Sequence, residues 1–478
     1  MKRKTRTILA IFLGICFIIF APYIILKSQG YIFDFENFKF TKAGGIFLKT
    51  IPQQTTILAA NKVIQSQNSI LYNGVFISDL IPKEYYVEVS ASYLTNFNWS
   101  KYLRVEPLTV NKATRIVLPI SRIEATSTEI FTSNFDKFYP LNNTQFLINS
   151  SSSIWLINLI ENNSTSTSTS TFIADFQDYS LLNNQEIKDI KISANNQDLL
   201  ILAPNNNGLL ITSDKITLLS RAFQNFLNET DSKLTDLEFY FNPLKNEELI
   251  IINKAREMYA FDTSTFSFYK TPYQDILTFS KENNNNNLLL TTKGFIYSLN
   301  YADLSQEPIQ IYALPIYYFE NYTDINYLDK NHIILWKKNG KLILLDLKTN
   351  QLETLSENAV LIKPISEKIA ILEKDSLKIN FISEVFDDLK YQKGETIVLL
   401  NNLNSSQIKE IYFTNNNWYL VLAADNKLVI VEIDKRNPIN HWEIPLEKID
   451  YPLNLDNNSG EFKWLSANKY FKAKIFPY

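Results

Sequence analysis

The chain has 478 residues, of which 45% are hydrophobic and 13% aromatic, and its net charge is −3. This composition, with 32 Phe and 26 Tyr against 10 Gly, is typical of packed β structure and argues against a disordered chain. The near-neutral charge argues against nucleic acid as a partner, and a single cysteine excludes a disulfide framework and a thiolate metal site.

The N-terminal segment predicts a membrane anchor. Four cations (Lys2, Arg3, Lys4 and Arg6) precede an apolar run over residues 8–26, which is long enough to cross about 30 Å of hydrocarbon. The run ends without the small residues of a signal-peptide cleavage site. We therefore expect residues 1–27 to form a cytoplasmic basic end and a transmembrane anchor that contacts the lipid bilayer through residues 8–26. The charge bias then makes this a single-pass protein of the cell membrane with residues 28–478 extracytoplasmic.

Residues 28–44 form a juxtamembrane segment in which aromatic residues recur at short intervals. They are Tyr31, Phe33, Phe35, Phe38 and Phe40. Such a pattern is found both in short strands and in the aromatic belt at a membrane interface. The sequence alone leaves both interpretations open.

Residues 45–120 predict a small β domain. A first strand is closed by Pro52, and further on Tyr85, Val87 and Val89 alternate with Tyr86 and Glu88. This alternation predicts a strand with one buried face.

A spaced set of residues in this region follows the pattern of a known family. In order, these residues are Pro52, Leu80, Pro82, Tyr85, Val87, Val89, Tyr93 and Trp99. The segment, residues 45–119, thereby resembles the PEGA family of small extracytoplasmic β-sandwich modules. Gln53, Gln54 and Thr55 stand where the name-giving Glu-Gly-Ala would follow the proline, and Lys83 and Ser92 replace two glycines. The resemblance implies a β-sandwich, and an unrelated sandwich with a similar rhythm is the alternative.

The remaining sequence is a repeat. After a linker at residues 121–133, two apolar strands around a polar turn recur seven times within residues 134–478, and each pair predicts a hairpin. The pairs are Phe146–Asn149 with Ile154–Leu159, Leu199–Leu202 with Leu209–Thr212, Leu249–Ile252 with Met258–Asp262, Leu288–Thr291 with Phe295–Asn300, Ile333–Trp336 with Leu342–Leu347, Ile369–Leu372 with Leu377–Ile382, and Tyr419–Leu422 with Leu428–Ile433.

A period of about 40 to 50 residues with four short strands is typical of β-propellers. We therefore expect an all-β fold in which a transmembrane helix and a small PEGA-like β-sandwich precede a β-propeller of no specific family. Tandem β-sandwiches are the alternative to the propeller.

The C-terminal strands predict how the propeller closes. Phe462–Leu465 and Tyr470–Phe476 amount to half a blade, which alone would leave an unpaired edge. The nearest upstream segment of β character, Thr128–Ser133, is predicted to cover that edge. This gives eight blades with a shared closing blade, and seven blades if the tail pairs elsewhere. Two polar tracts, Ser164–Thr171 and Asn283–Asn287, are predicted to be loops at blade edges because they have nothing to bury.

No catalytic, cofactor-binding or metal-binding residue is predicted. His332 and His441 lack a local motif partner, and each is expected to be a turn or packing residue. The carboxylate pairs Glu247–Glu248 and Asp387–Asp388 are expected in solvated loops, because neighbours on a strand point to opposite faces.

Two further candidates concern ligands. The segment Asn454–Gly460 only partly matches a calcium loop, since its glycine comes one place late and no bidentate Glu follows, so calcium near Asp456 stays an open question. The tryptophans Trp99, Trp155, Trp336, Trp418, Trp442 and Trp464 are candidates for stacking on glycans, but four of them lie in or beside apolar strands, where core packing explains them.

These observations predict a non-enzymatic protein. We expect a membrane-anchored, extracytoplasmic binding or scaffolding module of the cell envelope, with an envelope protein or glycan as its partner. The alternatives are a structural or assembly factor of a membrane complex and a propeller enzyme acting on glycans, which fold analogy permits.

Overall fold

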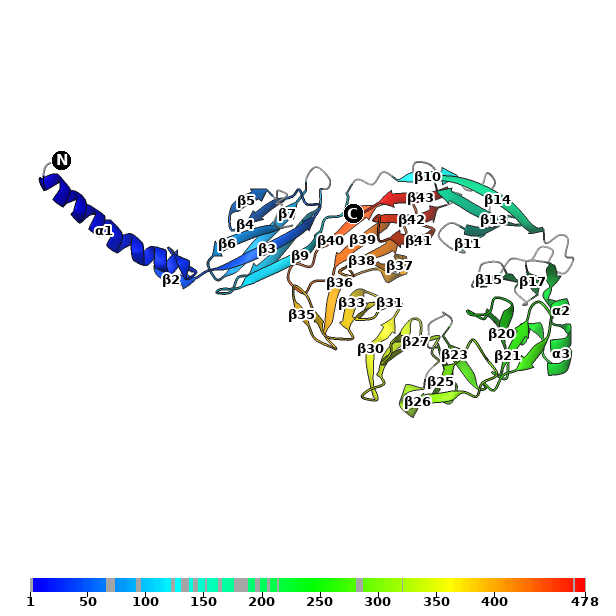
Figure 1. The fold of residues 1–478 in the computed structure, drawn as a ribbon. Coiled ribbons are helices and arrows are strands. Elements are labelled where there is room, and N and C mark those ends of the chain that lie inside the picture. The colour runs from blue at the N-terminus through cyan, green and yellow to red at the C-terminus, as the bar shows by residue number, and fades with distance from the viewer. Residues whose placement is uncertain are drawn as a thin grey trace.

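A helix, a small β module and a ring of four-stranded sheets follow one another along the chain (Figure 1). The computed structural model describes residues 3–65, 74–91, 96–121, 125–129, 137–140, 145–150, 153–161, 166–175, 188–193, 198–203, 207–212, 215–280, 287–319, 321–466 and 469–477.

Helix α1 (Arg3–Ser28) projects away from the rest of the molecule (Figure 1). Its apolar side chains are exposed, among them Phe17 and Ile18 at 73% and 71%. The stretch Ile11–Ser28 is long and apolar enough to cross a membrane, which fits an anchor or a signal sequence. A hairpin of β1 (Tyr31–Asp34) and β2 (Lys39–Lys42) follows, so Tyr31, Phe33 and Phe40 lie in short strands, whereas Phe35 and Phe38 lie in the turn between them.

The N-terminal module (residues 44–118) consists of two sheets, with strand orders β6-β3-β9 and β5-β4-β7-β8. Its strands are β3 (Gly44–Ile51), β4 (Thr56–Ala59), β5 (Lys62–Gln65), β6 (Val75–Leu80), β7 (Glu84–Ser90), β8 (Asn98–Arg104) and β9 (Val110–Val117). The sheets share a core that includes Leu48 from one sheet and Val87 and Trp99 from the other. The predicted alternation in β7 is confirmed, because Tyr85, Val87 and Val89 are buried and Tyr86 is exposed.

The ring (residues 126–477) has the radial arrangement of a β-propeller, and its described residues form eight four-stranded antiparallel sheets (Figure 1). In chain order the strands are β10 (Thr126–Glu129), β11 (Lys137–Pro140), β12 (Gln145–Ser150), β13 (Ser153–Glu161), β14 (Ser166–Asp175), β15 (Asp189–Ile192), β16 (Leu199–Leu202), β17 (Gly208–Ile211), β18 (Ile216–Leu218), β19 (Glu238–Phe241), β20 (Glu248–Ile252), β21 (Met258–Asp262), β22 (Phe268–Lys270), β23 (Ile276–Phe279), β24 (Asn287–Thr291), β25 (Phe295–Leu299), β26 (Ile309–Ala313), β27 (Asp324–Asp329), β28 (His332–Trp336), β29 (Gly340–Asp346), β30 (Gln351–Ala359), β31 (Leu361–Ile365), β32 (Lys368–Leu372), β33 (Ser376–Phe381), β36 (Thr396–Asn401), β37 (Ile408–Phe413), β38 (Tyr419–Ala424), β39 (Lys427–Glu432), β40 (His441–Pro445), β41 (Tyr451–Asp456), β42 (Glu461–Ser466) and β43 (Lys469–Lys474).

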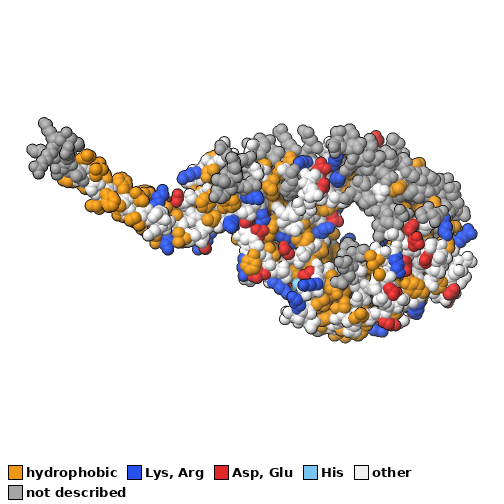
Figure 2. Space-filling model, viewed as in Figure 1, with side chains coloured by type: hydrophobic (Ala, Val, Ile, Leu, Met, Phe, Trp, Pro, Cys, Tyr) orange, Lys and Arg blue, Asp and Glu red, His pale blue; other side chains and the backbone are white. Residues whose placement is uncertain are grey.

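Seven of these sheets contain the predicted hairpins as their two middle strands. Middle strands are buried on both faces, since they pack against the neighbouring sheets, and they therefore read as continuous apolar runs. In β38, for example, all six residues are buried. In space-filling view the ring is hollow at its centre (Figure 2).

The two ends of the ring pair with each other. Strand β10 pairs antiparallel with β43, from Thr126 opposite Lys472 to Glu129 opposite Lys469, and completes the sheet β10-β43-β42-β41. The predicted covering segment, Thr128–Ser133, overlaps β10 at its first two residues, and its other residues lie outside the described part of the chain.

The polar tract at Ser164–Thr171 was predicted to be a loop, and this prediction is wrong for its described residues. Ser166–Asp175 forms β14, the outermost strand of its sheet. Threonine is β-branched and favours extended backbone, and an outermost strand needs few buried side chains. In the second tract, Asn283–Asn287, only Asn287 is described, and it begins β24.

Several short elements were not predicted from the sequence. A hairpin of β34 (Val385–Phe386) and β35 (Lys390–Tyr391) lies between β33 and β36. Helices α2 (Leu219–Ala222) and α3 (Gln224–Thr230) follow β18, and 3-10 turns cover Leu234–Asp236, Ile316–Tyr318 and Ser405–Gln407.

Candidate functional site at the joint between module and ring

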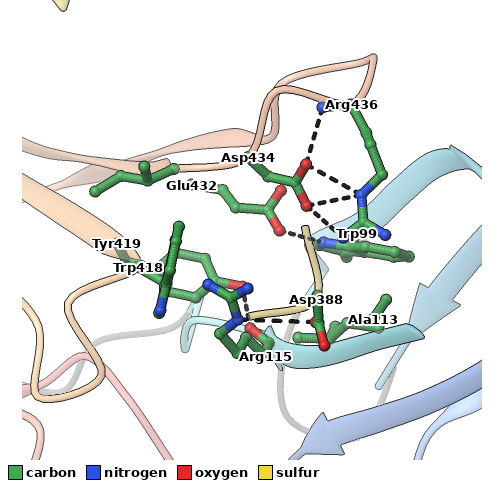
Figure 3. A pocket seen from close by; sticks show the side chains of 11 residues that line it. Trp99, Ala113, Arg115, Asp388, Trp418, Tyr419, Glu432, Asp434 and Arg436 are labelled. Carbon is green, nitrogen blue, oxygen red and sulfur yellow. Dashed lines mark hydrogen bonds and ion pairs between the residues drawn. The ribbon is translucent and has the colours of Figure 1, made fainter. Parts of the chain in front are cut away.

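The N-terminal module is attached to the ring by an extensive contact, which we call the joint. Strands β8 and β9 of the module meet β38 to β40 and the β34–β35 hairpin of the ring (Figure 3). One hydrophobic core runs through the joint and contains residues of both parts.

The ring covers the free edge of β8, the edge strand of its sheet. The backbone N–H of Ser100 donates to Oδ1 of Asn440 at 3.0 Å, and its carbonyl accepts from Nδ2 of Asn440 at 3.1 Å. The N–H of Tyr102 donates to the carbonyl of Asn437 at 2.9 Å. Because a free strand edge can pair with unrelated chains, this cover both protects the module and fixes where it docks.

A buried ion pair lies at the centre of the joint. Nζ of Lys101 in β8 is 3.1 Å from Oε2 of Glu432 in β39, and the two side chains are 0% and 7% exposed. Lys101 also donates to the carbonyl of Arg436 at 2.8 Å. The carboxylate of Glu432 further accepts from Nε1 of Trp99 at 2.8 Å and from Nδ2 of Asn440 at 2.7 Å. Both charges are therefore satisfied only when the module and the ring are together.

A second buried pair lies in the loop between β39 and β40. The guanidinium of Arg436 is hydrogen-bonded to both carboxylate oxygens of Asp434 at 2.5 to 3.1 Å. It also donates to the carbonyl of Lys112 in β9 at 2.9 Å. Burial alone would raise the pKa of Asp434, but the hydrogen bonds and charge of Arg436 hold it below its ordinary value. Asp434 thus fixes the orientation of the Arg436 guanidinium, which donates to the backbone of the module.

The turn of the β34–β35 hairpin also contacts β9. Asp388 accepts from the backbone N–H of Thr114 at 2.6 Å and from its hydroxyl at 2.8 Å, and the Asp388 side chain is only 5% exposed. Nε of Arg115 lies 3.2 Å from Oδ2 of Asp387. The expectation of a solvated loop is therefore wrong for Asp388, because its buried carboxylate is hydrogen-bonded to Thr114 of the module.

Aromatic side chains complete the joint. The hydroxyl of Tyr419 in β38 donates to the carbonyl of Arg115 at 2.8 Å and accepts from the N–H of Val117 at 3.0 Å. The Arg115 guanidinium lies 3.5 Å from the centre of the Trp418 ring, and Nζ of Lys368 lies 3.6 Å from the same centre. Both cations thus contact the ring of Trp418 at the distance of a cation–π interaction.

Lys368 is a buried cation near the joint. Its residue is 0% exposed, and its Nζ has no hydrogen-bond partner among the described residues. Burial lowers the pKa of Lys368 to about 7.

The geometry of the joint is that of a packed contact. The cavity between its residues measures about 10 Å³, which is room for about one water molecule. Sequence reasoning missed this site. The available signal was Lys101, which shares one face of β8 with Trp99 and Leu103, because a cation on an apolar face requires a buried partner.

The predicted turn and packing histidines are found in different surroundings. His332 is the buried first residue of β28 and follows the turn. Asp329 accepts from its backbone N–H at 3.0 Å and lies 2.8 Å from its Nδ1, so His332 does have a local partner. Asp346, which is paired with Lys393 at 2.5 Å, is 3.7 Å from Nε2 of His332. His441 begins β40 and is exposed.

The remaining candidates do not converge on one site. Glu247 is exposed, whereas Glu248 accepts from Asn242 at 2.5 Å. Asp456 accepts from the backbone N–H of Asn458 and the hydroxyl of Ser459, so its carboxylate shapes a turn. Among the described residues, no group of three or more His, Cys, Asp or Glu side chains is placed to hold a metal ion.

A separate hollow of about 280 Å³ lies along the innermost strands β27, β31 and β37 and the adjacent β28. Its wall combines Trp336 and Tyr327 with the charged groups Asp324, Lys363 and Glu410. Within the described part of the chain, no ion pair of Lys363 or Glu410 is found. A hollow that combines aromatic rings with charged groups of both signs is suited to a polar partner.

Neither a family model nor a curated protein matches the sequence. Solved structures with a similar fold include PorZ, an essential bacterial surface component of the type-IX secretion system of Porphyromonas gingivalis (10% identity, TM-score 0.37, 71% of this chain). The chain spans only 42% of the length of PorZ. Others are the C-terminal WD40 domain of Sif2 (10% identity, TM-score 0.43, 73% of this chain and 98% of that one) and BamB from Moraxella catarrhalis (10%, 0.39, 73% and 100%). The propeller architecture itself follows from the sheets described above.

Proposed function

We propose that this chain is a membrane-anchored scaffold that holds a β-propeller rigidly outside the membrane, where the propeller binds an envelope partner. The joint carries this proposal. Lys101 and Glu432 come from different parts of the chain and lie in one desolvated cluster with the Arg436 loop. A shifted docking would leave a buried charge without its partner, so the cluster allows one orientation of the ring on the module.

The anchoring part of the proposal rests on α1. The apolar side chains of the helix are exposed, and four basic residues (Lys2, Arg3, Lys4 and Arg6) precede its apolar stretch. We infer that residues 8–26 span the membrane, with the N-terminus cytoplasmic and residues 28–478 extracytoplasmic.

Two finer features of the fold belong to the same proposal. We infer that the eight sheets are the eight blades of a single ring, which β10 and β43 close. We also infer that the N-terminal module is a PEGA-like sandwich. The burial of the motif residues Leu80, Tyr85, Val87, Val89 and Trp99 supports this inference.

The partner is proposed to contact the hollow at Trp336. An envelope protein fits best, because the acids Asp324 and Glu410 and the base Lys363 would complement side chains of both signs. A non-catalytic role is part of the proposal. Hydrolysis of a glycan or ester by the protein, lost on a single carboxylate-to-alanine substitution, would overturn it.

The anchoring is tested by fractionation and protease treatment. The full chain is expected to stay in the membrane pellet after a carbonate wash, and a deletion of residues 3–28 should release it. Protease added to spheroplasts should digest residues 45–478. Protection of that region, while a control surface protein is cut, would contradict the proposed topology.

The scaffold role is tested by cross-linking in cells. Trp336→Ala is expected to reduce the yield of a cross-linked envelope partner, and so is Lys101→Met, which loosens the joint. Tyr269→Ala is the matched control, because Tyr269 is a partly exposed aromatic residue on β22, the outermost strand of its sheet. Equal yields for all three variants and the unaltered chain would contradict the proposal.

A further inference from the structure

The hairpin between α1 and the N-terminal module carries an exposed aromatic cluster. We call the residues 31–42 the aromatic hairpin. The ring of Phe33 makes edge contacts with those of Phe35, Phe38 and Phe40 at centroid distances of 5.0, 6.3 and 5.2 Å. The three outer rings are 75%, 81% and 43% exposed. The three outer rings contact Phe33 but leave much of their own apolar surface uncovered by the described part of the chain, and a patch of this kind indicates an interaction site.

The hairpin is built firmly, so this exposure is a property of the fold. Oδ1 of Asp34 accepts from the backbone N–H groups of Glu36 and Asn37 at 2.9 and 3.2 Å, and Oδ2 accepts from the Asn37 side chain at 2.8 Å. The turn holds Phe38 at a φ of 49°, in the left-handed region that bulky residues rarely adopt. Strain at an exposed apolar residue points to a function for that residue.

The position of the hairpin indicates what covers these rings. Helix α1 ends at Ser28, and the hairpin begins three residues later. The N–H of Gly30 donates to the carbonyl of Lys27 in the last turn of the helix, and its carbonyl accepts from the N–H of Ala43 at the base of the hairpin. The carbonyl of Ala43 accepts from the N–H of Leu108, so the hairpin is joined to both the helix end and the module. Leu108 is itself 59% exposed. The exposed aromatic rings therefore lie close to the end of the apolar helix.

The charges around the hairpin agree with a lipid headgroup region. Lys27, Lys39 and Lys42 are exposed, and Figure 2 shows Lys and Arg side chains gathered where the helix meets the module. Among the acids of the hairpin, Asp34 is buried in the turn, and Glu36 lies 3.6 Å from Lys83. Aromatic rings with adjacent cations are the side chains that favour the interface of a phospholipid bilayer.

We propose that the aromatic hairpin inserts into the interfacial region of the bilayer that α1 spans, and thereby sets the tilt of the module on the membrane. This inference rests on the proposed anchoring by α1. The hairpin acts as a second, peripheral contact beside the helix, because its rings reach the boundary of headgroups and acyl chains while its lysines contact lipid phosphates.

The test uses the full chain in nanodiscs of phosphatidylcholine with phosphatidylglycerol, in a Cys16→Ser background. A nitroxide is attached at Glu36→Cys in the hairpin, at Ile18→Cys in the helix or at Val63→Cys on an exposed strand of the module. Power saturation compares the collision of each label with oxygen, which enters the bilayer, and with a nickel chelate, which stays in water. We expect the label at 36 to be intermediate between a deep label at 18 and an aqueous label at 63.

Each outcome is decisive. A label at 36 that behaves like the one at 63, while the label at 18 is deep, would overturn the hairpin inference and leave the anchor intact. An aqueous label at 18 would overturn both. A label at 36 hidden from both reagents would show a protein contact in place of lipid.

A variant of the aromatic residues gives an independent readout. Phe35→Ser with Phe38→Ser is expected to shift the label at 36 to aqueous behaviour without lowering the melting temperature in detergent, whereas Val63→Ser should leave the label unchanged. A fall in melting temperature with an unchanged label would show that the rings have only a structural role.

Discussion

Replacing Lys101 by methionine should loosen the joint. The methionine fills most of the same space without the charge, so the Glu432 carboxylate keeps its hydrogen bonds from Trp99 and Asn440 but loses its counter-charge. Removing one partner of a buried ion pair typically costs about 3–5 kcal/mol. That is a large part of a stability margin of about 5–15 kcal/mol for a typical domain.

Hydrogen exchange measures this loss at the joint itself. The amides of Ser100 and Tyr102 donate across the joint to Asn440 and Asn437, so their protection reports docking directly. Since each 1.4 kcal/mol is a factor of ten, Lys101→Met should speed their exchange by roughly a hundredfold to several thousandfold.

The control is Lys427→Met. Lys427 lies 2.8 Å from Glu443, but these side chains are 34% and 55% exposed, and such pairs contribute about 0–1 kcal/mol. If Lys101→Met changes the exchange of the two amides no more than Lys427→Met does, the reasoning about the joint is refuted. A double variant with Glu432→Gln should recover part of the loss, because it removes the uncompensated charge.

Three further changes test other parts of the structure. Lys368→Met should stabilise the protein more at pH 6 than at pH 10. The pKa of Lys368 is about 7 in the folded protein and about 10.5 in the unfolded chain, so the unaltered protein gains stability as the pH rises from 7 to 10.5. If thermal unfolding shows the same stabilisation by Lys368→Met at both pH values, the assignment is contradicted. Asp388→Asn should destabilise the joint by about 1–3 kcal/mol, because Thr114 loses a charged acceptor, and Asp387→Asn should do less, with chemical denaturation as the measurement. Deleting residues 460–478 removes the partner of β10 and should lower the melting temperature of the whole ring, whereas an unchanged, cooperative transition would show that the tail is an appendage.

The repeat was readable from the sequence because the middle strands of each sheet are buried on both faces. Segments such as Leu199–Leu202 and Met258–Asp262 were placed to the residue. The outermost strand β14 contains a Ser/Thr tract with no apolar run, which is why the sequence predicts a loop there. The short helices after β18 and the β34–β35 hairpin have too few residues for a periodic pattern to show.

The joint could not be predicted, because its residues are far apart in the chain and belong to two parts that sequence patterns treat separately. Lys101 and Glu432 are 331 positions apart by their numbers, and each lies in an ordinary strand. In the sequence Asp388 is one of two adjacent acids of a predicted loop, and only the structure shows that it accepts hydrogen bonds from Thr114 of the module. A lysine between Trp99 and Leu103 on the apolar face of a strand predicts that the lysine is buried, but it does not predict which acid pairs with it.

A distance measurement tests the central claim that the joint holds the ring in one orientation. Nitroxide labels at Val63→Cys in the module and Ile309→Cys on β26 of the ring, both at exposed positions, are placed in the full chain with Cys16→Ser. Pulsed electron–electron double resonance in nanodiscs should then give one narrow distance distribution. Lys101→Met should broaden this distribution, and Lys427→Met should not. A broad distribution in the chain with an intact joint would contradict the account.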